Sequence, residues 1–299
     1  MNKKLYLYII LSAIFFGTME VALKLASSAL DPFQITFLRF LIGGVFLLPF
    51  AVVESRRRAR GTMTLRLCLY MVLLGVVNVP IGMILFQYGV QYSNAATAAV
   101  IFCSNPIFIM LFSHILSADD KMNARKALAL VIGVAGLVFM IRPWDIQPGN
   151  TIHGVLLSVG AAVVFGLYSV LGARSLGRVG PFTQTSSSFL IGAALLGGMM
   201  PVLGHPVLAG VSGEIPVLLY VSVVVTGCGY LFYFLAIKAS NASTGSIVFF
   251  LKPVIAPVFA VLILGEKITW NMLIGIALIL AASYFLLFGG RKRQARAQA

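Results

Sequence analysis

Residues 240–255, SNASTGSIVFFLKPVI, repeat much of the pattern of residues 93–108, SNAATAAVIFCSNPIF. A second pair of stretches, SALDPFQITFLRFLIGGVF at 28–46 and GRVGPFTQTSSSFLIGAAL at 177–195, matches without gaps at nearly the same offset. The two shifts align Asn94 with Asn241, Thr97 with Thr244, Phe102 with Phe249, Pro106 with Pro253, Pro32 with Pro181, Phe16 with Phe165 and Gly17 with Gly166. Two ungapped matches at almost one offset indicate an internal duplication.

The chain is too apolar for a water-soluble domain. It has 299 residues, of which 60% are hydrophobic and 10% are charged, and its mean hydropathy is +1.01. A soluble domain usually carries about 25% charged residues. Apolar runs of the roughly 20 residues that cross a ~30 Å hydrocarbon layer as a helix fill most of the sequence. A transmembrane β-barrel would need short segments of alternating polarity instead, so we predict an all-α integral membrane protein.

Polar residues divide the chain into ten predicted transmembrane helices. They cover residues 5–27, 35–53, 67–88, 95–116, 124–142, 153–173, 184–204, 216–237, 243–264 and 270–289. Each half of the chain, 1–147 and 148–299, holds five of them, and because five is odd the second copy enters the membrane from the opposite side. The predicted fold is therefore two inverted five-helix repeats. Such repeats are typical of alternating-access carriers, whose substrate site lies near the midplane where the halves meet.

The net charge of +14 is distributed unevenly over the loops. With the N-terminus inside, most Lys and Arg residues fall in inner loops and tails, and the densest internal group is at residues 56–60. This positive-inside bias predicts a multi-pass protein of the cytoplasmic (inner) membrane with both termini in the cytoplasm. Contact with anionic membrane lipid explains the basic segments, so we expect no nucleic-acid partner.

The motifs offer little support for other functional classes. The apolar run behind the basic N-terminus is too long for a signal peptide, and it has a repeat partner in the second half. Cys68, Cys103 and Cys228 are odd in number and far apart, which favours neither a disulfide framework nor a metal cluster. No HExxH, GxSxG or Walker motif is present. We therefore predict that the protein is not an enzyme and uses no metal or cofactor.

Three stretches carry a family resemblance: FFGTMEVALKLASSALDPFQITFLRFLIGG at 15–44, SNPIF at 104–108 and LKPVIAPVFAVLILGE at 251–266. They resemble the ten-span EamA branch of the drug/metabolite transporter superfamily, and the resemblance covers essentially the whole chain. It implies a permease for small metabolites, commonly an exporter of amino acids or related solutes, that uses no ATP. Glu20 departs from the neutral or amide residue expected from the family, which leaves the charge of the substrate open.

Lys252 is the one charge deep in the ninth apolar segment. Such a charge costs roughly 2.5–3.5 kcal/mol on insertion scales, and about nine residues into a helix it lies near the midplane. Asn105 occupies the equivalent position of the first half. Pro106 and Pro253 cannot donate to the carbonyls one turn back, and Pro257 repeats the predicted helix break. We expect Lys252, Asn105 and the freed carbonyls to bind a carboxylate; a structural lysine bonded to a backbone carbonyl is the alternative.

Glu20 is a second ionisable residue inside a segment. It lies one helical turn from Lys24 and on the same side as Arg39, and one interpretation pairs it with either of these outer-side anchors. The other interpretation makes Glu20 a proton or amine acceptor that faces a cavity. The remaining candidate substrate contacts are Ser169, which is the repeat partner of Glu20, and the two tyrosines Tyr168 and Tyr230, which lie well inside their segments.

These observations predict a secondary transporter that exports small metabolites, namely amino acids or related carboxylated solutes, by alternating access. Lys252 and Asn105 would hold the anionic end of the solute, and Glu20 an amine or a coupling proton. The alternative is a proton-coupled exporter of organic cations or drugs that uses Glu20. A hypothesis from another class is a non-transporting membrane protein, such as a sensor. Because one chain holds both halves, a monomer is sufficient to complete the cavity.

Overall fold

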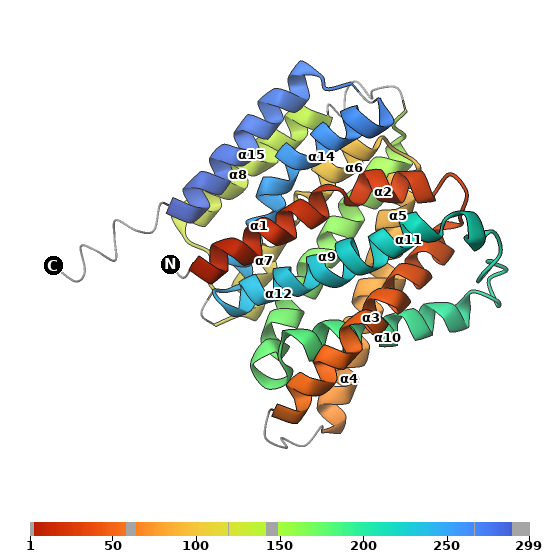
Figure 1. Cartoon of the computed structure of the whole chain (residues 1–299). Coiled ribbons are helices and arrows are strands. Elements are labelled where there is room, and N and C mark those ends of the chain that lie inside the picture. Colours follow the sequence, from red (N-terminus) through yellow and green to blue (C-terminus); the bar gives the residue numbers. More distant parts are fainter. Residues whose placement is uncertain (1–2, 58–63, 119, 142–148, 266, 289–299) are drawn as a thin grey trace.

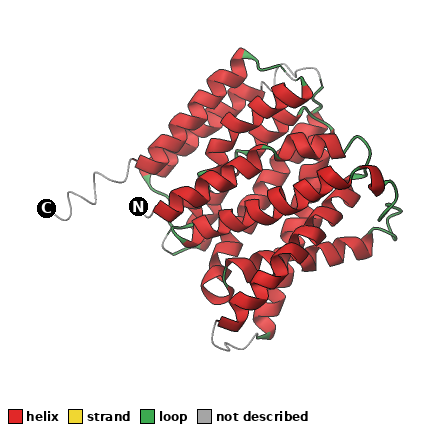
Figure 2. Cartoon of the chain, in the orientation of Figure 1, coloured by secondary structure: helices red, strands yellow, loops and turns green. Residues whose placement is uncertain are grey.

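The computed structural model describes residues 3–57, 64–118, 120–141, 149–265 and 267–288, and all regular structure in these ranges is helical (Figure 2). The helices form ten segments that coincide with the ten predicted ones. Those of the first half are α1 (Lys3–Gly17) with α2 (Met19–Ala26), α3 (Pro32–Arg57), α4 (Leu65–Val76) with η1 (Val77–Met83) and α5 (Ile84–Gln91), α6 (Ala95–Phe102) with α7 (Asn105–Leu116), and α8 (Ala124–Ile141). Those of the second half are α9 (Ile152–Val179), α10 (Pro181–Met199), α11 (Ile215–Leu219) with η3 (Tyr220–Cys228) and α12 (Gly229–Lys238), α13 (Ala242–Gly245) with α14 (Val248–Leu264), and α15 (Trp270–Phe288). A short 3₁₀ turn, η2 (Val211–Gly213), precedes α11.

Length and apolar composition make seven of these segments able to cross a membrane by themselves. They are Lys3–Ala26, Pro32–Arg57, Leu65–Gln91, Thr97–Leu116, Ile152–Val179, Ile215–Lys238 and Ala242–Leu264. The start of α1 and the end of α15 lie at the same end of the bundle, as an even number of crossings requires (Figure 1). The protein is an all-helical membrane protein, which confirms the predicted fold class.

Helices of the two halves pack on one another in repeat-related pairs. α3 lies along its repeat counterpart α10, and α8 lies along its counterpart α15 (Figure 1). α1 packs on α12 and α5 packs on α9, and these two contacts are equivalent when the halves are exchanged. An inverted repeat with a pseudo-two-fold axis produces this pattern, so the interface between the halves runs through the middle of the bundle.

Two repeat-equivalent glycines allow α1 to pack closely on α14 and α9 to pack closely on α7. A Cβ atom at Gly17 of α1 would overlap the side chain of Ile255 in α14, and one at Gly166 of α9 would lie 2.7 Å from Cβ of Phe108 in α7. Gly17 is the repeat partner of Gly166, and Phe108 is the partner of Ile255. Small residues let transmembrane backbones approach one another, so the duplicated Phe-Gly sequence has a packing role in both halves.

Four repeat-equivalent phenylalanines mark the centre of the interface. Phe16 stacks on Phe249 with ring centroids 5.5 Å apart, and Phe165 lies edge-on to Phe102 at 5.2 Å. Phe102 and Phe249, which are partners in the repeat, also meet at 5.9 Å. All four side chains are buried. Aromatic pairs at these separations add to the burial of apolar area, and they place the pseudo-symmetry axis at this cluster.

The two halves are interrupted at different places. Between α6 and α7 the break lies at Cys103 and Ser104, and Pro106 is the second residue of α7. In the second half α14 continues through Pro253 and Pro257, and the break lies earlier, between α13 and α14. Backbone bonds that reach only three residues back tighten the chain at that point. The predicted break at these two prolines is therefore corrected to a position before both.

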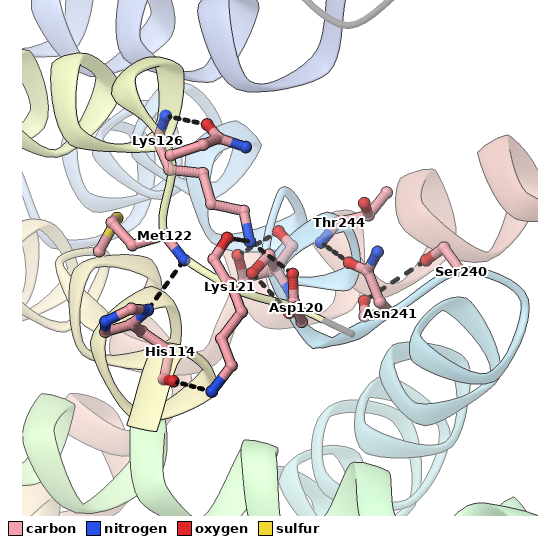
Figure 3. A network of polar contacts seen from close by, with 11 residues as sticks. His114, Asp120, Lys121, Met122, Lys126, Ser240, Asn241 and Thr244 are labelled. Atoms are coloured by element: carbon pink, nitrogen blue, oxygen red, sulfur yellow. Dashed lines mark hydrogen bonds and ion pairs between the residues drawn. The ribbon is translucent and has the colours of Figure 1, made fainter. Parts of the chain in front are cut away.

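A polar contact joins the halves at one end of the bundle (Figure 3). Asp120, in the connection between α7 and α8, pairs with Lys126 at 2.5 Å and accepts hydrogen bonds from the Ser243 hydroxyl at 2.7 Å and the Ser243 amide at 3.2 Å. Ser243 belongs to α13 in the second half. Burial by itself would raise the pKa of Asp120, but the hydrogen bonds from Lys126 and Ser243 outweigh burial and hold the pKa below its usual value.

Candidate substrate site

Lys252 and Glu20 form an ion pair between the halves, although 232 positions separate them in the chain. Nζ of Lys252, in α14, donates to Oε1 of Glu20, in α2. Both side chains are fully buried, and Oε2 of Glu20 has no hydrogen-bond partner among the described residues. The partners predicted for Glu20 from the sequence were Lys24 and Arg39, not Lys252. Lys24, one of the expected partners, donates to three backbone carbonyls after α5 and at its end, at 2.7–3.2 Å.

Two aromatic rings accompany the Lys252 ammonium. Nζ lies 5.1 Å from the centroid of Phe102 and 5.8 Å from that of Phe86, and the two rings are 4.4 Å apart. A cation near an aromatic face recovers part of the attraction that it loses with its water shell. Because a buried ion pair still carries a large desolvation cost, this pair is poorly explained as a device for stability alone.

Arg39 adds a second buried cation, which the sequence placed at the outer side as an anchor. Its side chain is fully buried in α3, with the guanidinium 4.7 Å from the centroid of Phe40. Its one hydrogen bond among the described residues is a weak contact of Nη1 with the sulfur of Met19 at 4.0 Å, and its Nε and Nη2 have none. No carboxylate of the described residues lies within 4.0 Å of its guanidinium, and Glu20 attracts it only from a greater distance. Of the two buried cations Lys252 and Arg39, only Lys252 is directly paired with a carboxylate of the described residues.

Three buried amide side chains have unused hydrogen-bonding groups. Asn105 begins α7, Asn78 lies in η1 and Gln87 lies in α5, and both polar atoms of each side chain are without a partner in the described part of the chain. Gln87 lies in the helix that carries one of the two rings beside Lys252, and Asn105 begins the helix that follows the other ring. Unsatisfied buried groups cost about 1–3 kcal/mol each. These amides thus offer donors and acceptors to a polar solute.

The other predicted contacts are held within the helix packing. The Tyr168 hydroxyl lies 3.0 Å from that of Ser188, and Ser169 donates to a carbonyl of its own helix at 2.8 Å. The Tyr230 hydroxyl contacts the sulfur of Met83 at 3.2 Å, and the Tyr230 ring packs edge-on against Phe16 at 5.2 Å. The structure therefore brings Lys252 and Glu20 together, whereas the polar groups of Tyr168, Ser169 and Tyr230 are engaged in contacts between or within helices.

Sequence reasoning named neither Arg39, Asn78 nor Gln87 as a site residue. Arg39 could have been found, because an ionisable residue inside an apolar segment is by default a functional candidate. The two amides gave a weaker signal, since their depth becomes clear only when helix boundaries and neighbours are known.

A cavity of about 690 Å³ opens at the end of the bundle where α7, α9 and α12 meet α13. Asp120 of the contact between the halves lines it, together with Arg174, Lys238 and Asn241. Arg174 and Lys238 lie in predicted inner loops or helix ends. The cavity therefore faces the side that carries most of the positive charge.

Comparison with known proteins assigns the chain to a family. The model of the EamA-like transporter family matches residues 3–142 and residues 152–288, so that each half is covered once. The chain belongs to the EamA-like transporter family. It is therefore a membrane transporter rather than an enzyme, and its substrate is a small molecule. This family assignment confirms the resemblance found in the sequence.

Several relatives match over nearly the full length. An uncharacterized transporter of Clostridium kluyveri is 35% identical over 288 residues, covering 94% of this chain and 92% of the relative. The uncharacterized transporter YoaV of Bacillus subtilis is 26% identical, covering 97% of this chain and 99% of the relative. One solved crystal structure, 20% identical, superposes with a TM-score of 0.75 over 98% of this chain and 100% of its own. That structure supports the fold alone.

Proposed function

We propose that this EamA-like transporter exports small solutes that carry a carboxylate, such as amino acids, across the cytoplasmic membrane by alternating access. The observation that supports this proposal is the buried Lys252–Glu20 ion pair together with a second buried cation, Arg39, which has no carboxylate within 4.0 Å among the described residues. The excess of positive charge favours an anionic group in the solute. In a medium of low dielectric constant, such an attraction is far stronger than in water.

An amino acid can separate Lys252 from Glu20 and still leave each of the two side chains with an oppositely charged partner. Its carboxylate would bind Lys252, with Arg39 as a second cation, and its ammonium group would bind Glu20. Breaking a buried ion pair by removing one partner costs about 3–5 kcal/mol, but a zwitterion that enters between the two side chains pairs both again. Asn105 and Gln87, with unused amide groups, would take up polar atoms of the solute.

The repeat architecture supplies a route for the movement. The site lies between halves that are related by inversion, so that an exchange of conformations between the halves opens it first to one side and then to the other. The breaks between α6 and α7 and between α13 and α14 give each half a place to bend near the site. Solute would enter from the cytoplasm through the 690 Å³ cavity.

A second candidate function is proton-coupled export of organic cations. The observation that favours it is the unpaired Oε2 of Glu20, which is free to accept a proton or a cation. In this case Glu20 would carry the function, and Lys252 would only balance its charge when no substrate is bound.

Counterflow in proteoliposomes separates the two candidates. Labelled amino acids, organic acids and organic cations are offered to the wild type, to Lys252→Gln and to Glu20→Gln, and exposed Lys267→Gln is the matched control. We expect Lys252→Gln to lose at least about tenfold in carboxylate exchange, which corresponds to ~1.4 kcal/mol of binding free energy, and Lys267→Gln to lose little.

The double variant Glu20→Gln/Lys252→Gln removes both charges and so leaves neither one buried alone. If it folds and still exchanges carboxylates at the wild-type rate, the ion pair is structural and the proposal is wrong. If organic cations alone are exchanged, and Glu20→Gln alone stops them, the second candidate is correct.

A further inference from the structure

A separate group of arginines lies where α4 meets α9, away from the buried ion pair. Arg66, Arg174 and Arg178 line a pocket of about 420 Å³ together with Leu67, Tyr70 and Ser175. Arg66 comes from the first half of the chain, and Arg174 and Arg178 come from the second. The pocket thus lies on the boundary between the halves, at the end of the bundle where α4 begins and α9 ends.

The pocket is positively charged and contains no acidic side chain among its lining residues. Within the described ranges, none of the three guanidinium groups has a carboxylate within 4.0 Å. Arginine presents a planar set of donors that matches the oxygens of a phosphate group. Three such groups around one pocket are complementary to a phosphate.

The helix dipole explains the position of Arg178 but not that of Arg66. Arg178 lies in the last turn of α9, where a cation is favoured by the helix dipole. Arg66 is the second residue of α4, and in a first turn the dipole disfavours a cation and favours an anion. A bound anion beside Arg66 would offset the unfavourable positive charge at the start of α4.

The surface beside the pocket indicates a lipid rather than a free phosphate. Leu65 and Leu69, on α4 next to Arg66 and Tyr70, are 75% and 59% exposed. Val72 and Leu73 continue this exposed apolar strip along the helix. A phosphate headgroup in the pocket would therefore leave its acyl chains along an apolar helix face. The Tyr70 hydroxyl donates to the carbonyl of Leu171 at 2.7 Å, which ties α4 to α9 below the pocket.

We propose that Arg66, Arg174 and Arg178 bind the phosphate headgroup of an anionic phospholipid and that this lipid bridges the two halves of the transporter. Basic pockets between transmembrane helices on the cytoplasmic side are suited to such headgroups. Arg174 also lines the 690 Å³ cavity, so the lipid would lie beside the proposed entry route. The site does not depend on the identity of the transported solute.

The test measures lipid binding by the full chain. Purified, delipidated protein is titrated with phosphatidylglycerol, with zwitterionic phosphatidylcholine or with inorganic phosphate, and bound lipid is counted by native mass spectrometry. The variants are Arg66→Gln/Arg178→Gln and the matched control Arg56→Gln/Arg57→Gln, which removes two exposed charges at the end of α3. We expect phosphatidylglycerol to bind the wild type and the control alike, and the pocket variant about tenfold or more weaker.

Equal weakening by both double variants would show that general surface charge attracts the lipid, and this result would overturn the proposal. Competition by inorganic phosphate at concentrations comparable to the lipid would assign the pocket to a free phosphate and overturn the lipid assignment. The variant Arg66→Lys/Arg178→Lys keeps the charge but loses the planar donor set. It should bind with intermediate affinity, and unchanged affinity would refute the role of guanidinium geometry.

Discussion

The contact of Asp120 with Lys126 and Ser243 gives a quantitative prediction for the substitution Asp120→Asn (Figure 3). Asparagine keeps the size of the side chain and one acceptor oxygen but removes its charge, so that Lys126 keeps only neutral acceptors, among them the carbonyl of Lys121 at 3.0 Å. Removing one partner of a fully buried pair costs about 3–5 kcal/mol. Because 8% and 10% of the two side chains remain exposed, we expect a smaller loss of about 2 kcal/mol in the free energy of unfolding.

The pH dependence has a defined sign. The pKa of Asp120 in the folded protein lies below its usual value, so the ionised form stabilises the fold. This contribution is present in full above the unfolded pKa of about 3.9 and is lost as the pH falls through the lower folded pKa. The difference between wild type and Asp120→Asn should therefore be constant at neutral pH and shrink below about pH 4.

Thermal unfolding in detergent, followed by intrinsic fluorescence, checks both statements. For a chain of 299 residues, a loss of about 2 kcal/mol corresponds to a decrease in Tm of roughly 3 °C. Glu214→Gln is the matched control, because no described ion pair or side-chain hydrogen bond includes Glu214. If Asp120→Asn and Glu214→Gln have the same Tm at pH 7, the proposed contribution of this contact is refuted.

Two further predictions concern the interface between the halves. Gly17→Ala should lower the free energy of unfolding by about 1–3 kcal/mol, because the added methyl group would overlap Ile255. Gly198→Ala is the control: a Cβ atom there has nothing within 4 Å, so this variant should have little effect in the same denaturation assay. Arg39→Gln removes one of the two buried cations and should weaken carboxylate binding about tenfold in counterflow. Its Tm should be equal to or above that of the wild type, because a buried guanidinium without a full set of partners is costly. Unchanged affinity for the carboxylate would exclude Arg39 from the site.

The ten helical segments and their duplication follow from local features of the sequence. Each segment is a predominantly apolar run, and seven of those described are long and apolar enough to cross a bilayer by themselves. A lipid environment can be inferred from such a run without knowledge of the neighbouring helices. The pairs Phe16 with Phe165 and Gly17 with Gly166 are read from the repeat alone. Their meaning as packing positions then follows from the structure, in which each pair occupies equivalent contacts.

The positions of the helix breaks depend on more than the prolines. Pro106 follows a break, but α14 passes through Pro253 and Pro257 without ending. A proline removes one backbone donor, and whether the helix ends there depends on what the surrounding helices offer to the freed carbonyl. The same local sequence pattern therefore gives different breaks in the two halves.

Sequence alone identified Lys252 and Glu20 as costly charges inside apolar segments, but not that they pair. Their spacing of 232 residues carries no geometric information, whereas the i,i+4 spacing of Glu20 and Lys24 suggested a nearer partner. The tertiary structure decided the pairing because the inverted packing brings α2 and α14 together at the interface. Burial of Arg39 has the same origin: hydropathy reports that a helix lies in the membrane, and only the packing of the other helices determines which of its faces is removed from lipid and water.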